Sequence, residues 1–143
     1  MTRPAPRMCN RADGPGLGGS ARHEVTDADT AAALGSGDVP VLATPRLIAW
    51  MEAAAAQSAA PFLGTGQTTV GTAVRIEHRR ATPVGGSVEI SAAPPRDAAG
   101  RRLTFIVHAT DESGHLVAAA VIDRAIVDRQ RFLAAASDGN ASH

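Results

Sequence analysis

The sequence contains no lysine, no tyrosine and only one cysteine. Without lysine, no side-chain amine is available to form a Schiff base or to act as an amine nucleophile. The single cysteine, Cys9, excludes a disulfide framework, a CxxC motif and a thiolate metal cluster within this chain. This cysteine usage fits a reducing compartment, so we expect a cytoplasmic protein.

Net charge, aromatic residues and long hydrophobic runs are also scarce. The 14 basic residues, all arginine, balance 14 Asp and Glu, so the chain lacks the field that attracts nucleic acid or anionic membranes. Three Phe and one Trp offer little surface for stacking on bases. No segment approaches the roughly 20 apolar residues that span a bilayer. We therefore expect neither a nucleic-acid partner nor a membrane partner.

The chain is expected to form one domain between two tails. Residues 1–21 are rich in proline, glycine and arginine and lack apolar periodicity, which predicts a disordered N-terminal tail. Residues 134–143 are predicted to form a disordered C-terminal tail. The remaining residues 22–133 are enough for a single domain with a sizeable core.

One long helix is predicted in this domain. Thr44 and Pro45 are typical of a helix start, with Thr44 as N-cap and Pro45 as the first helical residue. Strong helix formers follow and stop at Pro61, so we predict a helix over 45–60. Its apolar face is broad and it carries little charge, which is typical of a buried helix.

Beyond the helix the apolar period changes from 3.6 to 2, which predicts strands. We place them at 70–78, 87–92, 102–110 and 116–128, with a short strand at 23–26 before the helix. The last three are expected to form an antiparallel meander. In the first long strand, one face is predicted to carry Val70, Thr72, Val74, Ile76 and His78, and the other Gly71, Ala73, Arg75 and Glu77. The fold class is therefore α+β, with a sheet that can wrap a central helix.

Four segments together resemble the fluoroacetyl-CoA thioesterase-like family of hot-dog-fold proteins. They read VLATPRLIAWMEAA, VGTAVRIEHRRATPVG, GRRLTFIVHATDESG and DRAIVDRQRF, in this order. The resemblance covers roughly residues 22–133. It implies a hot-dog fold, in which an antiparallel sheet wraps a long central helix, and acyl-CoA thioesterase activity.

The resemblance also implies roles for individual residues. Thr44, Glu52 and His78 match the family's catalytic threonine, glutamate and histidine. Gly71 matches a glycine close to the acyl group, and Arg124 matches an arginine near the cofactor-binding region. The segment GSGDVPVLAT before Thr44 lacks the phenylalanine lid of the fluoroacetate enzyme, so we do not expect selectivity for the fluorinated substrate.

The chemistry of thioester hydrolysis agrees with these residues, because it needs an activated nucleophile and stabilisation of an oxyanion. Glu52 is expected to act as base to a water or as direct nucleophile, and His78 as proton shuttle. The backbone N–H groups of Arg46 and Leu47, at the helix start, are candidate donors to the substrate. Candidates for binding CoA phosphates are Arg75, Arg79 and Arg80.

The predicted function is therefore hydrolysis of an acyl-CoA or acyl-carrier thioester, without a metal or redox cofactor. A homodimer is expected because a single sheet leaves an open edge and an open helix flank. The alternative is a non-catalytic acyl-CoA binding module on the same fold.

Other enzyme classes are disfavoured by missing motifs. A hot-dog hydratase would place Asp and His about five residues apart on one helix, and the helix over 45–60 has no such pair. The five histidines show no HxH or HExxH spacing for a metal hydrolase. No GxSxG motif of a serine hydrolase occurs.

Overall fold

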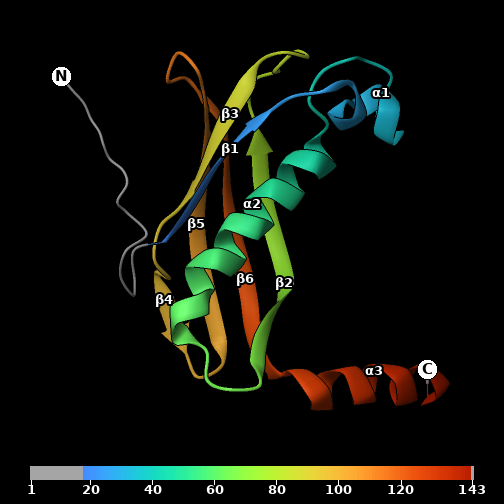
Figure 1. Ribbon diagram of the computed structural model, residues 1–143, viewed down its shortest axis with the longest axis vertical. Helices are drawn as coiled ribbons and strands as arrows, with labels where there is room; N and C mark the ends of the chain where they lie inside the picture. Colours follow the sequence, from blue (N-terminus) through green and yellow to red (C-terminus); the bar gives the residue numbers. More distant parts are fainter. Residues whose placement is uncertain (1–17, 143) are drawn as a thin grey trace.

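A computed structural model describes residues 18–142, which form an antiparallel sheet curved around one long helix (Figure 1). The strand order is β1-β3-β5-β6-β2, and β4 pairs with β5 beside this path. The α+β fold class and the wrapped helix are confirmed. The strands are β1 (Gly19–Glu24), β2 (Gln67–His78), β3 (Ser87–Ala92), β4 (Asp97–Ala99), β5 (Arg102–Asp111) and β6 (Leu116–Asp128).

The central helix α2 spans Thr44–Ala59 without a break, close to the predicted range. Its N-cap is Ala43 rather than Thr44, because the Leu47 N–H donates to the Ala43 carbonyl at 3.0 Å. Thr44 is therefore the first helical residue and Pro45 the second. The buried side of α2 carries Leu47, Met51, Ala54, Ala55, Ser58 and Ala59.

The core lies between α2 and the concave face of the sheet. Alternate residues of β5 point toward the helix, and Phe105 among them is 0% exposed. Such full burial of one large apolar side chain contributes about 1.5–3 kcal/mol. The small side chains of α2 let the helix pack closely on the sheet. At Gly19 of β1 the approach is so close that an added Cβ would collide with the Ala54 carbonyl.

A β-bulge interrupts β2 where it pairs with β6. Gly71 pairs with Arg124 and Ala73 with Asp123, so Thr72 is the additional residue. A bulge residue shifts the alternation of faces. Gly71 consequently faces the helix together with Val74, and the predicted placement of Gly71 on the opposite face from His78 is wrong.

Three predicted segments need correction. The domain begins at Gly19, before the predicted boundary at residue 22, because Gly19 to Glu24 pair with β3. The predicted loop before α2 contains the short helices η2 (Asp27–Asp29) and α1 (Ala31–Leu34), and β4 occupies part of a predicted turn. A further 3-10 turn, η3 (Ala60–Phe62), follows α2. The rest of the predicted N-terminal tail, residues 1–17, lies outside the described residues.

The structure continues as a helix into the range 134–143, where the sequence predicts a C-terminal tail. Helix α3 spans Arg129–Ser142 and extends away from the sheet (Figure 1). The Asp128 carboxylate accepts from the Arg131 N–H at 2.8 Å and so satisfies one free donor at the helix start. Within the described residues, no helix is long and apolar enough to cross a membrane.

Strands β1 and β2 are the two edges of the sheet. On the helix side of β2, Val74 and Ile76 are only half-buried although they pack against the core. A twelve-residue edge with half-buried apolar side chains is a surface that pairing with another chain would cover.

Candidate active site

Thr44 and His78 form a hydrogen-bonded pair at one end of α2. Thr44 is the first residue of the helix and His78 the last residue of β2. The Thr44 Oγ1 lies 2.7 Å from the His78 Nδ1. The fold thus brings together two predicted site residues that are 34 positions apart in the chain.

Burial lowers the pKa of His78 below its ordinary value of 6.5, against a smaller opposing effect of the hydrogen bond with the Arg80 backbone. The imidazole is therefore neutral at pH 7. In a neutral ring whose Nδ1 accepts the Thr44 O–H, the Nε2 carries the proton. That Nε2 is buried and has no hydrogen-bond partner among the described residues, so a substrate can accept its proton only if the atoms that cover it move aside.

A cavity of about 410 Å³ opens beside this pair. Its wall is formed by the segment from α1 to α2, and by His78 and the residues after it. Apart from His78, no lining residue has an aromatic ring. The lining residues are Ala31, Ser36, Gly37, Val39, Val41, Leu42, Thr44, Pro45, His78, Arg79, Arg80 and Ala81.

The arginines at this cavity already have acidic neighbours. The Arg79 guanidinium lies 2.7 Å from Glu77, and the Nε of Arg80 lies 3.4 Å from Asp111. Arg79 is exposed, and a phosphate of CoA would have to compete with Glu77 for it. Its predicted role in substrate binding stays a prediction.

Glu52 lies in the middle of α2, where its carboxylate is directed at the sheet. Its Oε2 is 3.6 Å from the Arg124 Nη1, and 36% of its side chain is exposed. A Cβ added to Gly71 would collide with this carboxylate, so Glu52 lies directly against the Gly71 backbone. Three more predicted site residues, Glu52, Gly71 and Arg124, therefore form a second group.

Arg124 is fixed from the other side by β2. Its Nε donates to the Thr69 hydroxyl at 2.9 Å, and its Nη2 donates to the Thr69 carbonyl at 3.0 Å. Burial lowers the pKa of Arg124, and the nearby Glu52 carboxylate opposes that effect. The guanidinium remains charged, because its ordinary pKa is far above neutrality.

The two groups are separated along the helix. Thr44 and Glu52 are eight residues apart on the unbroken α2, a rise of about 12 Å at 1.5 Å per residue. A single carbonyl carbon cannot contact both from one chain. The structure thus gives two half-sites per chain rather than one compact triad.

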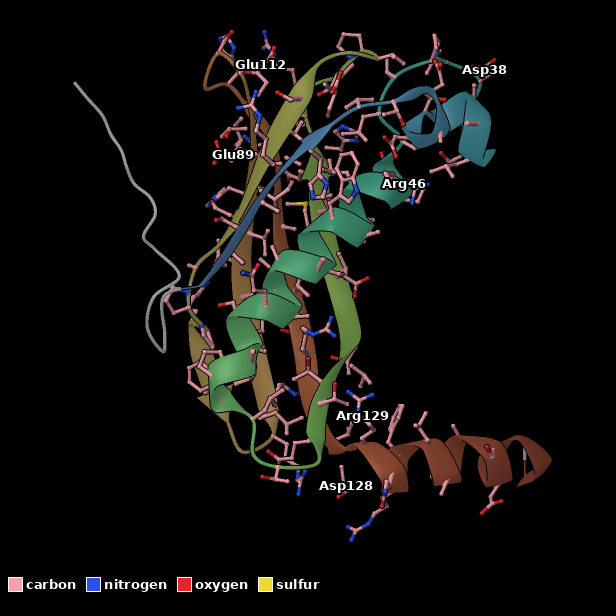
Figure 2. The ribbon with its side chains drawn as sticks, in the orientation of Figure 1. Asp38, Arg46, Glu89, Glu112, Asp128 and Arg129 are labelled. Carbon is pink, nitrogen blue, oxygen red and sulfur yellow. The ribbon has the colours of Figure 1, made fainter. Side chains whose placement is uncertain are left out.

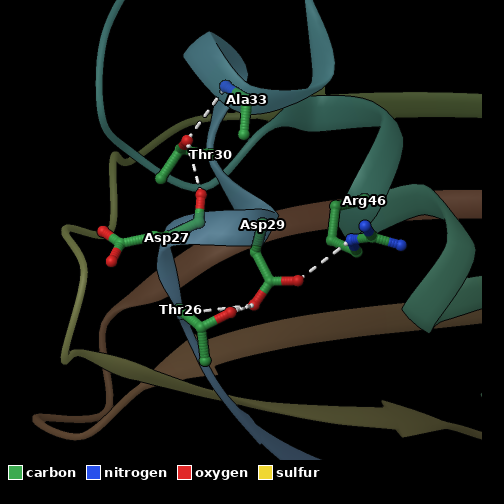
Figure 3. Close-up of polar contacts among 6 residues, drawn as sticks. All are labelled: Thr26, Asp27, Asp29, Thr30, Ala33 and Arg46. Atoms are coloured by element: carbon green, nitrogen blue, oxygen red, sulfur yellow. Dashed lines mark hydrogen bonds and ion pairs between the residues drawn. The ribbon is translucent and has the colours of Figure 1, made fainter.

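The start of α2 offers fewer free backbone donors than expected. The Leu47 N–H is used by Ala43, which corrects the prediction that it is available to substrate. No backbone carbonyl within residues 18–142 accepts the Arg46 N–H. The Arg46 side chain turns away and forms an ion pair with Asp29 at 3.0 Å (Figure 3).

Comparison with known proteins agrees with this geometry. The family model described as fluoroacetyl-CoA-specific thioesterase (FlK) matches residues 25–130. The chain belongs to this family. The matched range includes both half-sites, with Thr44, Glu52, His78 and Arg124.

Individual relatives support the assignment to the fluoroacetyl-CoA-specific thioesterase family. A fluoroacetyl-CoA thioesterase of Streptantibioticus cattleyicolor is 34% identical over 92 residues, which are 64% of this chain and 65% of that protein. The matched region thus spans slightly less than two thirds of that relative. A mutant of the thioesterase FlK, solved with fluoroacetate and CoA, is 28% identical with a TM-score of 0.76, covering 84% of this chain and 97% of its own.

A thioesterase superfamily member from Thermus thermophilus has the same fold. It is 24% identical, with a TM-score of 0.81, and the match covers 91% of this chain and 96% of that one. The hot-dog fold predicted for this family member is therefore confirmed.

One residue of the site has no signal in the sequence. Thr69 holds Arg124 through its hydroxyl and its carbonyl, but a threonine on a strand is usually interpreted as a residue with high strand propensity. Only the pairing of β2 with β6 shows that Thr69 lies beside Arg124. Glu52 and His78 are predicted because charged or polar groups are unusual on apolar faces, whereas Gly71 and Arg124 are predicted from the family resemblance alone.

Proposed function

We propose that this protein hydrolyses acyl-CoA thioesters to the free acid and CoA. The observation that carries the proposal is the Thr44–His78 hydrogen bond of 2.7 Å at the mouth of a cavity. Membership of the fluoroacetyl-CoA-specific thioesterase family supports it. A relative solved with fluoroacetate and CoA has the same fold, which supports a CoA thioester as the substrate.

The proposed mechanism assigns the chemistry to Glu52 and His78. The Glu52 carboxylate takes a proton from a water that attacks the carbonyl carbon, or attacks that carbon itself to form a mixed anhydride that water then hydrolyses. The carbon–sulfur bond breaks, and the proton released by the water passes through His78 to the departing thiolate, so that Glu52 ends ionised and His78 ends neutral. The His78 Nε2 and the Arg46 N–H are candidate donors to the oxyanion; removal of one such donor typically costs about 3–4 kcal/mol of barrier.

The complete site in this proposal needs two copies of the chain. Two copies that pair their β2 edges antiparallel place the His78 end of one strand beside the Gly71 half of the other. Thr44 and His78 of one copy then lie near Glu52 of its partner. This arrangement removes the separation of about 12 Å that a single helix imposes, and it covers the half-buried Val74 and Ile76.

We also propose that the acyl group is not restricted to fluoroacetyl. On the side of the loop before α2, the cavity beside Thr44 is lined by small and aliphatic residues, and no phenylalanine, tyrosine or tryptophan lines it. Discrimination by one small substituent in an apolar pocket is worth only about 1–3 kcal/mol. Fluoroacetyl-CoA should therefore be hydrolysed with no preference of several thousand-fold over acetyl-CoA.

A panel of acyl-CoA substrates, followed by release of free thiol, tests the proposed function. Wild-type protein should turn over at least one short acyl-CoA, while Glu52→Gln should lose on the order of 10²-fold or more in kcat. His78→Ala should also lose rate.

Matched controls keep this test specific. Glu89→Gln and His108→Ala change the same residue types on the outer face of the sheet, where both side chains are exposed (Figure 2 labels Glu89). Both controls should retain wild-type rates. Saturable acyl-CoA binding without turnover across the panel would instead support the non-catalytic binding module.

A further inference from the structure

Thr69 contacts the buried arginine of the site in two ways. It lies on β2 two residues before Gly71, and it is 9% exposed. Its hydroxyl accepts from the Arg124 Nε, and its backbone carbonyl accepts from the Nη2 of the same guanidinium. One residue thereby fixes two of the three nitrogens of Arg124.

The third nitrogen points at Glu52. The Arg124 Nη1 lies 3.6 Å from the Glu52 Oε2, and the same carboxylate lies against Gly71. A guanidinium is planar and its donors form a rigid fork, so fixing two nitrogens also fixes the position of the third.

We infer that Thr69 is a positioning residue for thioester hydrolysis, holding Arg124 so that its guanidinium keeps the Glu52 carboxylate in place against Gly71. The inference rests on the proposed function, because it requires Glu52 to act on the substrate. Arg124 is the intermediate in this chain of contacts, and Thr69 acts only through it.

A substitution at Thr69 can remove its hydroxyl contact to Arg124 and leave its backbone contact, so a positioning role can be tested apart from a purely structural one. Its carbonyl belongs to the backbone and remains in every variant, so the buried guanidinium keeps one acceptor. Replacement of the hydroxyl by a methyl group conserves the volume and leaves the Arg124 Nε without its acceptor. The guanidinium can then rotate about its remaining bond, and the Glu52 carboxylate loses its fixed partner.

The test compares Thr69→Val with Thr69→Ser in steady-state hydrolysis of a short acyl-CoA. Thr69→Val should lower kcat roughly tenfold and leave KM within about twofold, because misplacing a reacting group lowers the rate without removing substrate contacts. Thr69→Ser restores the hydroxyl and should restore kcat. Thr72→Val is the matched control on the same strand, since its hydroxyl donates to the Asp123 carbonyl and not to Arg124; it should keep the wild-type kcat.

A double-mutant cycle gives the decisive readout. In a Glu52→Gln background, Thr69→Val should cost no further rate, because residues that act as one unit are not additive. A second tenfold loss in that background overturns the inference, as does equal impairment of Thr69→Val and Thr69→Ser. If Thr69→Val does not fold, Arg124→Lys replaces it in the same cycle, since one ammonium cannot hold Thr69 and Glu52 together.

The two proposals fail in different ways. Wild-type activity of Thr69→Val beside an inactive Glu52→Gln overturns the role of Thr69 alone. Wild-type activity of Glu52→Gln overturns the proposed role of Glu52 and the inference with it.

Discussion

At the scale of single residues, the proposed mechanism depends on the protonation of His78. Its pKa is lowered by burial from 6.5, and its Nδ1 is engaged with Thr44. A proton on Nδ1 would reverse this hydrogen bond, with Nδ1 donating to the Thr44 Oγ1. The proposed mechanism uses the neutral ring, which can take up a proton and pass it on.

The expected pH dependence follows from this shift. Because the pKa of His78 is lowered, its ring stays neutral at pH values somewhat below 6.5. The loss of kcat/KM caused by protonation of His78 should therefore begin below pH 6.5.

The same shift affects stability. The folded protein binds a proton on His78 less readily than the unfolded chain does, so the free energy of unfolding falls as the pH drops below 6.5. Rate profiles and thermal unfolding of wild type and His78→Gln between about pH 5 and about pH 8 measure both effects. Protonation of His78 above pH 7, followed by NMR of its ring, would contradict this expectation.

Gly71 provides a second prediction at this scale. A Cβ at this position would collide with the Glu52 carboxylate, which is the mobile end of a flexible side chain. Gly71→Ala should therefore fold normally and still lose about tenfold or more in kcat, because the carboxylate must move. Unfolding midpoints and kcat measured on the same preparations check this.

Gly64→Ala is the control for Gly71→Ala, since its added Cβ would meet only the Gln67 side chain, at an ordinary distance of 3.4 Å. It should change neither stability nor rate by much. Full activity of Gly71→Ala would show that Glu52 need not stay in its observed position.

At the scale of elements, η2 fixes the start of α2 and with it the position of Thr44. The Asp29 carboxylate accepts from the Thr26 N–H and hydroxyl, each at 2.9 Å, and pairs with Arg46 at 3.0 Å (Figure 3). The backbone of Asp29 also accepts from the Ala43 N–H at 2.9 Å. Burial tends to raise the pKa of Asp29, but the bonds from Thr26 and the charge of Arg46 outweigh it and lower the pKa below 3.8.

Asp29→Ala should lower the free energy of unfolding by about 1–2 kcal/mol near pH 7, through loss of these bonds. A lowered pKa means that the contribution of the carboxylate is present above about pH 4 and is lost as the pH falls through the folded value. The difference in the free energy of unfolding between Asp29→Ala and wild type, measured by urea denaturation, should thus become smaller toward about pH 3. Asp27→Ala is the control, because Asp27 accepts from Thr30 through its backbone carbonyl only; equal destabilisation by both variants would refute the role of the Asp29 carboxylate.

The accuracy of prediction from sequence differed between elements for physical reasons. Helix α2 and the long strands were predictable because their apolar periodicity is continuous over many residues. Strand β4 and helix α1 have three and four residues, too few for any period to show. Helix α3 was missed because its described side chains are exposed, so no apolar pattern of burial marks it.

The sequence predicts which residues belong to the candidate site, but it does not predict how they are arranged in space. Glu52 and His78 stand out as polar groups on apolar faces, and the family resemblance located Thr44, Gly71 and Arg124. The division into two half-sites depends on the length of an unbroken helix and on strand pairing. Neither Thr69 nor the use of the Leu47 N–H can be read from residue types alone.

At the scale of the whole molecule, the two half-sites make dimerisation a condition of activity in the proposed function. A mixed dimer of Thr44→Ala and Glu52→Gln chains tests this, provided that each homodimer is nearly inactive. If the site forms between chains, one site of the mixed dimer receives both wild-type residues, and about half of the wild-type activity per dimer should return.

If each site lies within one chain, every site of the mixed dimer carries a lesion and no activity returns. Light scattering after gel filtration gives the mass independently. A monomer of the 14.6 kDa chain at micromolar concentration would contradict the proposed arrangement.

The bulge in β2 determines whether the two half-sites can face each other at all. Gly71 and His78 are seven positions apart, an odd spacing that in a regular strand sends two side chains to opposite faces. The additional residue Thr72 turns this odd spacing into an even one. Loss of one residue between Ala73 and His78, with the bulge retained, would leave both half-sites chemically intact and reverse one of them relative to the other. Loss of Thr72 itself would remove the bulge and leave Gly71 and His78 on one face, so the bulge and the number of residues after it act together in placing the candidate site.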